Sequence, residues 1–383
     1  MSPEHPLYLD HNATTPVDPE VVDAMLPYLR EHFGNPSSGH PYGRRAHEAL
    51  EVARAQVAAL IGAKPSEILF TSGGTEANNL AIRGTAEARA ERRHLLTSTI
   101  EHPATKLPCD ALEWRGWRVT WLPVDSEGRV RVEDAERALD AEGAETALVS
   151  LMHSNNETGV VQPVAEIAAL AHRHGATVHT DAAQSVGKVP VDVKVLGVDL
   201  LTLVGHKLRA PKGVGALYVR EGTPLRAVTL GGGQERGLRP GTENVPYAVG
   251  LGVACELAGR RLSRGGSQAL VSLRERLWAR LSEAVPGVAL SGQGAWRLPN
   301  TLNVRFPGVR GGAVLAATPE VAASTGSACH DGGESASLVL RAMGIPEADA
   351  LGAVRLSLGP ETTQEEVDRA VVVLARGWRQ VAG

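Results

Sequence analysis

Aromatic residues and cysteines are both scarce in this sequence. Phe, Trp and Tyr make up only 4% of the 383 residues, so aliphatic side chains must form most of any hydrophobic core. The three cysteines, Cys109, Cys255 and Cys329, lie far apart and form no CxxC pair. This spacing argues against a disulfide scaffold and against a structural zinc site, and we expect no metal.

The sequence also lacks a strong excess of charge and a long apolar run. It contains 39 basic and 43 acidic residues, for a formal net charge of -4. Such a balance argues against a surface built to bind nucleic acid or an anionic membrane. No apolar segment is long enough to span a bilayer, and the first residues do not resemble a secretion signal. We therefore expect a cytoplasmic protein with no nucleic acid or membrane partner.

Hydrophobic runs alternate with helical patterns along most of the chain, whose length allows two domains. We predict strands at 67–70, 94–99, 117–122, 146–151, 177–180, 199–204 and 214–219. Helical patterns between several of them predict an α/β fold, with a mostly parallel mixed sheet covered by helices on both faces. A helical pattern over 246–285, broken near Gly265, leads into a smaller α+β region with strands at 301–306 and 353–358. We predict a large domain over 12–255 and a small domain formed by 1–11 and 256–383.

The predicted strand at 199–204 is followed directly by Gly205, His206 and Lys207. Open α/β sheets bind ligands at the carboxyl ends of their strands, so Lys207 would lie in such a crevice. Burial there would lower the pKa of the amine, and a neutral amine can form a Schiff base. The alternative reading of these residues alone is a solvated loop lysine.

Two further strand ends carry polar residues. Gly74 and Thr75 open a helix after the strand at 67–70, where free backbone amides and hydroxyls suit a phosphate. Asp181 follows the strand at 177–180 and could pair with a protonated ring nitrogen. Each feature also has a structural explanation as a helix cap. Together with Lys207 they match the phosphate, pyridine nitrogen and aldehyde of pyridoxal 5'-phosphate (PLP).

The chain resembles the cysteine desulfurases of the class-V aminotransferase family, which have the PLP-dependent transferase fold type I. The resemblance rests on an ordered set of short motifs: 8–15, 34–38, 71–76, 101–102, 155–159, 181–184, 205–207, 231–236, 239–244 and 355–359. It implies a homodimer that converts L-cysteine to L-alanine with PLP as cofactor.

The resemblance also implies roles for individual residues. The implied cofactor contacts are Gly74, Thr75, His102, Asn155, Asp181, Gln184, His206, Lys207 and, from a second subunit, Thr242. Among them Lys207 would carry the cofactor as a Schiff base, and Asp181 would bind its ring nitrogen. Gln184 would bind the phenolic oxygen, and His102 would stack on the ring and move protons. Asn155 and Arg355 would bind the substrate carboxylate, for which an Arg side chain is well suited.

Cys329 lies in the small, polar and Gly-rich segment 324–333, beside His330. Such a composition predicts a mobile surface loop with a reactive thiol. The resemblance implies that Cys329 takes the substrate sulfur as a persulfide and delivers it to an acceptor protein. Cys255 and Cys109 lie in apolar helical patterns, where we expect buried and inert thiols.

Val204 departs from the family pattern, because many desulfurases have a serine there that binds the cofactor phosphate. Valine before Gly205-His206-Lys207, together with Ala328-Cys329-His330 in the Gly-rich segment, is similar to selenocysteine lyases. Release of selenium from L-selenocysteine therefore remains an alternative. A non-catalytic scaffold or sulfur-relay protein on the same fold is a more remote one. Members that serve iron–sulfur cluster assembly often carry a longer C-terminal tail that docks to a scaffold protein. The resemblance therefore leaves open whether this chain binds such a scaffold protein.

Overall fold

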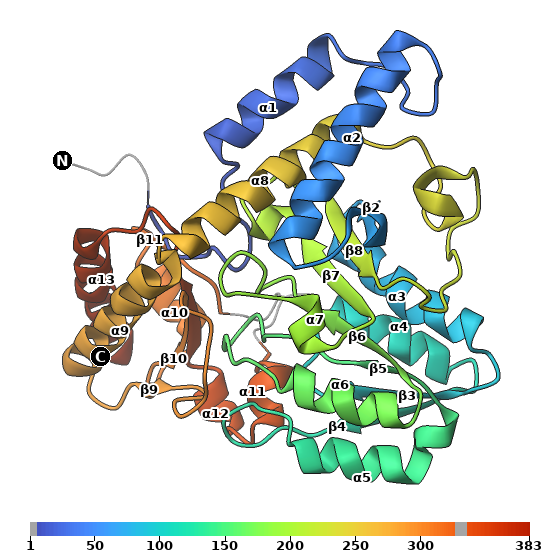
Figure 1. Cartoon of the computed structure of the whole chain (residues 1–383). Helices are drawn as coiled ribbons and strands as arrows, with labels where there is room; N and C mark the ends of the chain where they lie inside the picture. Colours follow the sequence, from blue (N-terminus) through green and yellow to red (C-terminus); the bar gives the residue numbers. More distant parts are fainter. Residues whose placement is uncertain (1–5, 326–334) are drawn as a thin grey trace.

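The computed structural model describes residues 6–325 and 335–383, so Cys329 lies outside the described residues. A seven-stranded sheet forms the centre of the larger part of the molecule (Figure 1). Its strands, in spatial order, are β2 (Ile68–Thr71), β8 (Gly215–Val219), β7 (Leu200–Val204), β6 (Thr177–Asp181), β5 (Thr146–Ser150), β3 (His94–Ser98) and β4 (Arg118–Leu122). The strands from β7 to β4 are parallel, whereas β8 runs antiparallel to both β7 and β2.

Helices cover both faces of this sheet because its buried strands are apolar on both sides. On β7, Leu200 packs into one hydrophobic cluster, while Leu201 and Leu203 pack into the main cluster on the opposite face. The face of Leu200 is covered by α3 (Gly74–Ala88) and α4 (Pro103–Glu113). The main cluster includes side chains from helices on the other face: α1 (Pro19–Arg30), α2 (Pro41–Leu60), α5 (Val132–Glu142), α6 (Val164–Arg173), α7 (Val193–Leu196) and α8 (Val245–Ser263).

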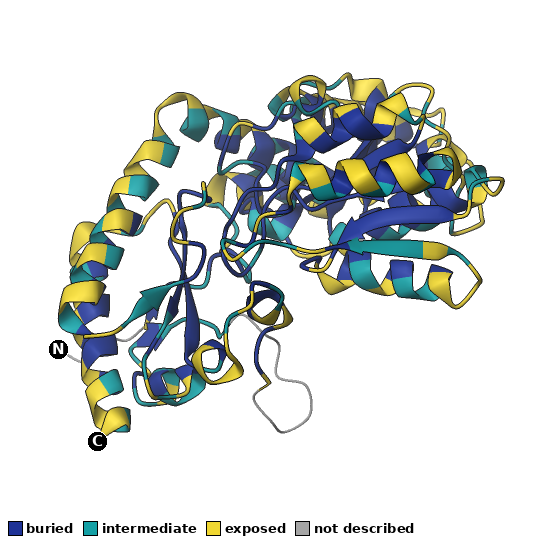
Figure 2. Ribbon diagram, turned by 90° about the horizontal axis from the view of Figure 1, so that it is seen from below, coloured by how far each residue is buried: buried dark blue, intermediate teal, exposed yellow. Residues whose placement is uncertain are grey.

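A smaller antiparallel sheet has its own hydrophobic core. Its strands are β12 (Ala353–Ser357), β10 (Thr301–Arg305) and β9 (Ala289–Leu290), with the parallel pair β1 (Leu7–Tyr8) and β11 (Val321–Ala322) nearby. The helices of this region are α9 (Gly266–Ala284), α10 (Gly311–Ala316), α11 (Leu338–Ala342), α12 (Glu347–Ala350) and α13 (Gln364–Ala382). Figure 2 shows buried strands in both regions and outer helices with one buried and one exposed face, as expected for amphipathic elements.

The predicted α/β fold is confirmed, and most predicted strands and helices lie within a few residues of their observed bounds. The break near Gly265 is also confirmed, since this residue has φ 79° between α8 and α9. The domain boundary at residue 255 falls inside α8 and stays a prediction.

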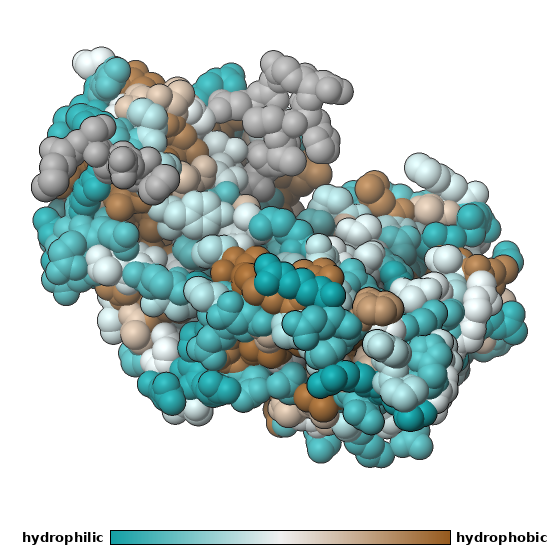
Figure 3. Space-filling model, turned by 90° about the horizontal axis from the view of Figure 1, so that it is seen from above, coloured by the Kyte–Doolittle hydropathy of each residue, from teal (hydrophilic) through white to brown (hydrophobic). Residues whose placement is uncertain are grey.

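The described surface is polar where Figure 3 shows it, with hydrophobic side chains in small groups separated by hydrophilic ones. Among the described residues, no helix is long and apolar enough to cross a membrane.

Candidate active site

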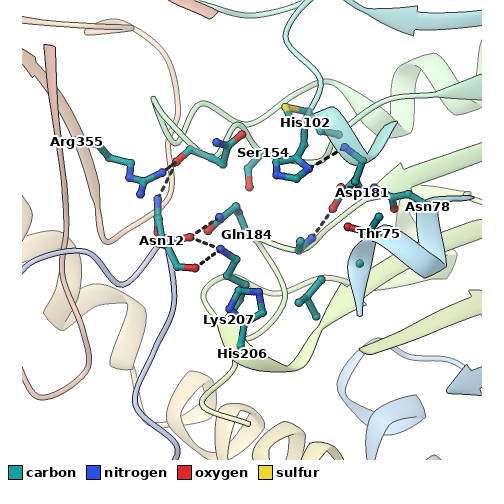
Figure 4. A pocket seen from close by; sticks show the side chains of 17 residues that line it. Asn12, Thr75, Asn78, His102, Ser154, Asp181, Gln184, His206, Lys207 and Arg355 are labelled. Atoms are coloured by element: carbon teal, nitrogen blue, oxygen red, sulfur yellow. Dashed lines mark hydrogen bonds between the residues drawn. The ribbon is translucent and has the colours of Figure 1, made fainter. Parts of the chain in front are cut away.

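A cavity of about 300 Å³ lies at the carboxyl ends of β6 and β7 (Figure 4). Both parts of the molecule contribute to its wall, because Arg355 comes from β12 of the small sheet. Residues predicted for the site make up a large part of the lining: Gly74, Thr75, His102, Asp181, Gln184, His206, Lys207 and Arg355. The cavity is therefore the place where the sequence motifs meet.

Lys207 enters the cavity from a short 3-10 turn that follows β7. Its Nζ donates hydrogen bonds to the carbonyl oxygens of Asn12 and Ala13, the latter at 2.7 Å. Burial, together with the positive charge of Arg355, lowers the pKa of the amine to about 8. A lysine in this setting has a much larger neutral fraction near neutral pH than a solvent-exposed lysine and can act as a nucleophile or a base.

Asp181 ends β6 and presents a buried carboxylate to the cavity. Its Oδ2 accepts a hydrogen bond from Asn78 Nδ2 at 2.7 Å, and its Oδ1 accepts one from the Ala183 amide at 3.0 Å. Asn78 lies on α3, so the helix that opens beside the cavity also orients the carboxylate. The fixed negative charge suits a cationic ring nitrogen.

His102 lies at the start of α4, where its Nδ1 accepts a hydrogen bond from the Ala104 amide at 3.1 Å. Desolvation lowers the pKa of the ring, while the nearby Asp181 charge opposes the change. With Nδ1 acting as an acceptor, a neutral His102 carries its proton on Nε2.

The first turn of α3 forms a cradle suited to an anion. No side chain of the described residues caps this helix, whose N-cap is Gly73 with φ 149°. A Cβ on Gly74 would lie 2.7 Å from Val204 Cγ2, so the cavity wall can approach the helix end only because residue 74 is glycine. Thr75 adds a hydroxyl, and His206 adds a ring that burial keeps neutral by lowering its pKa to about 4. Free amides at a helix N-terminus are the usual protein ligands of a phosphate.

Gln184 forms the floor of the cavity beside Lys207. Its Nε2 donates to the Asn12 carbonyl oxygen at 3.0 Å, and its Oε1 accepts from Lys188 Nζ at 2.9 Å. The Asn12 carbonyl thus receives hydrogen bonds from both Gln184 and Lys207.

Arg355 is buried and held by two partners. It donates to Asp10 Oδ1 at 2.7 Å and to the Asn156 carbonyl oxygen at 3.1 Å. Its buried Nε has no hydrogen-bond partner among the described residues. The guanidinium is thus oriented by the protein at the cavity wall.

The cavity does not include every residue predicted for it. In the described structure, Asn155 lies outside the lining, because its Oδ1 accepts from the Glu157 and Thr158 amides and shapes a turn. Its neighbour Asn156 lines the cavity instead. Thr242 is exposed before α8, away from the cavity of the described single chain. The assignments of Asn155 and Thr242 stay predictions.

The expected burial of two thiols is confirmed. Cys109 and Cys255 are both free and buried. Burial raises the pKa of the Cys255 thiol to about 12 and raises that of Cys109 as well. Neither thiol is therefore suited to act as a nucleophile near neutral pH.

Sequence reasoning assigned no role to Asn12, Asn78, Asn156 and Lys188, although each lines the cavity or binds a residue that does. The three asparagines reach the cavity from segments distant in sequence. Asn12 and Asn156 lie within the motifs 8–15 and 155–159, which assign them no role, and Asn78 lies outside every motif. Lys188 follows Gln184 by four residues in the segment after β6, and this short separation could have placed it near Gln184.

The chain matches the class-V aminotransferase family over residues 7–370. A curated relative, "Cysteine desulfurase 2" of Trichormus variabilis, is 48% identical over 370 residues, which cover 96% of this chain and 92% of the relative. A solved structure described as "NIFS-LIKE PROTEIN" has a TM-score of 0.91 at 37% identity and covers 98% of this chain and all of its own. Another, described as "SspA in complex with cysteine", has a TM-score of 0.81 at 38% identity and covers 93% of this chain and 99% of its own.

These similarities agree with the geometry of the cavity and extend over nearly the whole chain. The resemblance drawn from the sequence motifs is thereby confirmed at the level of the family. The chain belongs to the class-V aminotransferase family.

Proposed function

We propose that the protein is a PLP-dependent cysteine desulfurase, which converts L-cysteine to L-alanine and transfers the sulfur to Cys329. The observation that carries the proposal is the convergence of Lys207, Asp181 and the first turn of α3 on one cavity. The names of the curated relatives support it, because those at 45–48% identity are cysteine desulfurases.

The residues present fit the cofactor. The α3 cradle with Thr75 and His206 would hold the phosphate, Asp181 would hold the ring nitrogen, and Lys207 would hold the aldehyde. Lys207 and the cradle lie in the same cavity as Asp181, which a molecule carrying all three groups requires. When bound, the cofactor supplies an electron sink for the bond that breaks at the substrate α-carbon.

The remaining steps belong to side chains of this chain. Arg355 would bind the substrate carboxylate, since its guanidinium lines the cavity and is held in place by Asp10 and Asn156. Lys207 would remove the proton from the substrate α-carbon, as its lowered pKa of about 8 suits a base near neutral pH. His102, with its proton on Nε2, would exchange protons on the substrate side of the ring.

Cys329 would accept the sulfur. In this step the Cys329 thiolate would attack the substrate sulfur, and the electron pair of the broken Cβ–S bond would stay on Cβ, which gains a proton and becomes the methyl group of alanine. The outer sulfur of the resulting persulfide would then pass to an acceptor protein. Cys329 lies outside the described residues, but it follows Ser324 by only five residues. Ser324 pairs with Arg355 of the cavity wall, and five extended residues span up to about 18 Å. The sequence distance is therefore short enough for the thiol to reach the cavity.

The proposal is tested by assaying alanine and sulfide formation from L-cysteine in the PLP-loaded protein. We expect Lys207→Ala to abolish turnover and Cys329→Ala to lower it at least 100-fold, while Cys109→Ala retains most of it. Normal turnover in the Lys207 or Cys329 variant would contradict the assigned roles. A wild-type protein that does not bind PLP would overturn the proposed function and favour a non-catalytic protein on the same fold.

Val204 keeps a second substrate in consideration, because it lines the cavity beside the α3 cradle and offers no hydrogen bond to a phosphate. The same assay with L-selenocysteine distinguishes the two. A kcat/KM for L-selenocysteine that exceeds that for L-cysteine only when Cys329 is replaced would support a desulfurase. A large preference in the intact protein would support a selenocysteine lyase.

Two further elements of the proposal concern assembly and location. The exposed position of Thr242 suits a contact to the cofactor site of a second subunit, as expected for a homodimer. A cytoplasmic location agrees with a reactive Cys329 thiol, which a reducing compartment preserves.

A further inference from the structure

A second lysine lies behind the cavity and contacts two of the groups that form its floor. Lys188 Nζ is 2.9 Å from Gln184 Oε1 and 2.8 Å from Asn12 Oδ1. Asn12 Oδ1 also accepts from Asn300 Nδ2 at 3.2 Å. Lys188 therefore joins the turn after β6 to the N-terminal turn that contains Asn12, whose carbonyl oxygen binds Lys207.

These contacts fix the orientation of the Gln184 amide. Its nitrogen faces the Asn12 carbonyl, which can only accept, and its oxygen accepts a hydrogen bond from the Lys188 amine. The reversed amide would place its own oxygen against the Asn12 carbonyl oxygen, two acceptors with no proton between them. Gln184 Nε2 uses one hydrogen on Asn12, so its second hydrogen remains available to a ligand in the cavity.

We infer that Lys188 is a positioning residue, which holds Gln184 so that the cavity presents a hydrogen-bond donor to an ionised oxygen of the ligand. The inference rests on the proposed function, in which that oxygen is the phenolate of PLP. The role of Lys188 is indirect, since Gln184 lines the cavity and Lys188 contacts it from behind.

The surroundings of the Lys188 amine also disfavour its charged form. Burial lowers its pKa well below the usual value, and the charges of Lys207 and Arg355 lower it further. Burying an amine costs free energy unless the amine is hydrogen-bonded, and Lys188 meets this requirement through its bonds to Gln184 and Asn12.

A double-mutant cycle on PLP affinity tests this role without relying on turnover. The apparent Kd for PLP is measured by absorbance titration of the full chain after removal of its cofactor. Lys188→Met keeps the aliphatic stem but removes the donor, and Gln184→Leu removes the amide on which Lys188 acts. We expect Lys188→Met to raise the Kd about tenfold in the wild-type background, the effect of losing one well-placed hydrogen bond. In the Gln184→Leu background the same change should alter the Kd less than about twofold.

Two further variants make the result specific. Lys188→Arg retains donors and should return the Kd to within about threefold of the wild-type value. Lys194→Met, an exposed lysine on α7, is the matched control and should leave the Kd unchanged. If Lys188→Met does not fold, Lys188→Leu enters the same cycle, because it also lacks a donor.

Equal effects of Lys188→Met in the two backgrounds would overturn the inference, since Lys188 would then act independently of Gln184. An unchanged Kd in Lys188→Met would overturn it as well. In both cases a wild-type protein that binds PLP and turns over L-cysteine would leave the proposed function intact.

Discussion

Glu101 carries a buried carboxyl group and precedes His102, the N-cap residue of α4. Its Oε1 accepts from Ser98 Oγ at 2.6 Å and from the Met152 amide at 3.0 Å, whereas its buried Oε2 has no partner among the described residues. Burial raises the pKa of this carboxyl to about 8, and the Asp181 charge contributes in the same direction. Glu101 is therefore protonated near neutral pH, and it holds Met152 in the cavity wall as a neutral acid.

The raised pKa predicts a specific effect of pH on stability. Because the folded state binds this proton more tightly than the unfolded state, its contribution is full below pH about 4.5 and is lost as the pH rises toward 8. The slope is about 1.4 kcal/mol per pH unit at most. Glu101→Gln mimics the protonated form, so we expect its urea midpoint to equal that of the wild type near pH 5 and to exceed it at pH 9.

The measurement is the urea midpoint of the wild type and of Glu101→Gln between pH 5 and 9, with both proteins loaded with PLP to the same extent. The exposed Glu113→Gln serves as the control and should follow the wild-type curve. Parallel curves for Glu101→Gln and the wild type would show that Glu101 is ionised when folded.

At the scale of elements, the strands could be predicted because their apolar runs are continuous and are bounded by turn residues. The orientation of β8 could not, because an apolar run reads alike in both directions. The pairing of β1 with β11 was also missed, as two residues carry too little periodicity to reveal a strand.

The same distinction applies to the site. Lys207 and Asp181 could be placed from sequence because Asp181 ends one strand and Lys207 lies three residues after the neighbouring one, and parallel strand ends converge. Asn12 could not be placed, because its contacts to Gln184 and Thr301 join segments 172 and 289 residues apart. Such contacts arise only when the two sheets are packed together.

The segment between β8 and α8 is held by a buried ion pair. Arg54 of α2 donates to both carboxylate oxygens of Glu235, at 2.8 and 2.9 Å, and the Phe70 amide donates to the same carboxylate at 3.0 Å. Glu235 and Arg236 have φ values of 46° and 59°, in the left-handed region that non-glycine residues rarely adopt. Backbone strain of this kind persists only where surrounding contacts enforce it.

We therefore predict that Arg54→Met lowers the free energy of unfolding by about 3–5 kcal/mol, since it leaves the Glu235 charge buried and unpaired. The double variant Arg54→Met with Glu235→Met should recover much of that loss, because no uncompensated charge remains. Urea unfolding of the three proteins checks the result. A loss below about 1 kcal/mol in the single variant would mean that the ion pair does not hold the segment.

At the scale of the whole molecule, several buried histidines oppose the effect of Glu101. Burial lowers the pKa of His11, His153 and His179 to about 4. His153 bonds to Ser185 Oγ at 2.7 Å, and His179 bonds to hydroxyls of β5 and β7, so both rings lie within polar contacts of the packed sheet. All three are neutral in the folded protein at neutral pH.

A folded-state pKa below the unfolded value of about 6.5 gives stability that is full above that pH and is lost as the pH falls toward 4. As the pH falls through this window, each histidine lowers the free energy of unfolding by up to about 1.4 kcal/mol per pH unit, whereas Glu101 raises it by a similar amount. His206 is a fourth histidine of this kind, and burial raises the pKa of Glu157 as it does that of Glu101. Because the four histidines outnumber the two carboxyl groups, we expect the urea midpoint to fall as the pH is lowered from 7 to 5. His153→Gln, which does not titrate, should reduce this fall by about a quarter of the histidine contribution, while the exposed His47→Gln should leave it unchanged. A wild-type midpoint that stays constant between pH 7 and 5 would show that these rings do not control the response of the fold to acid.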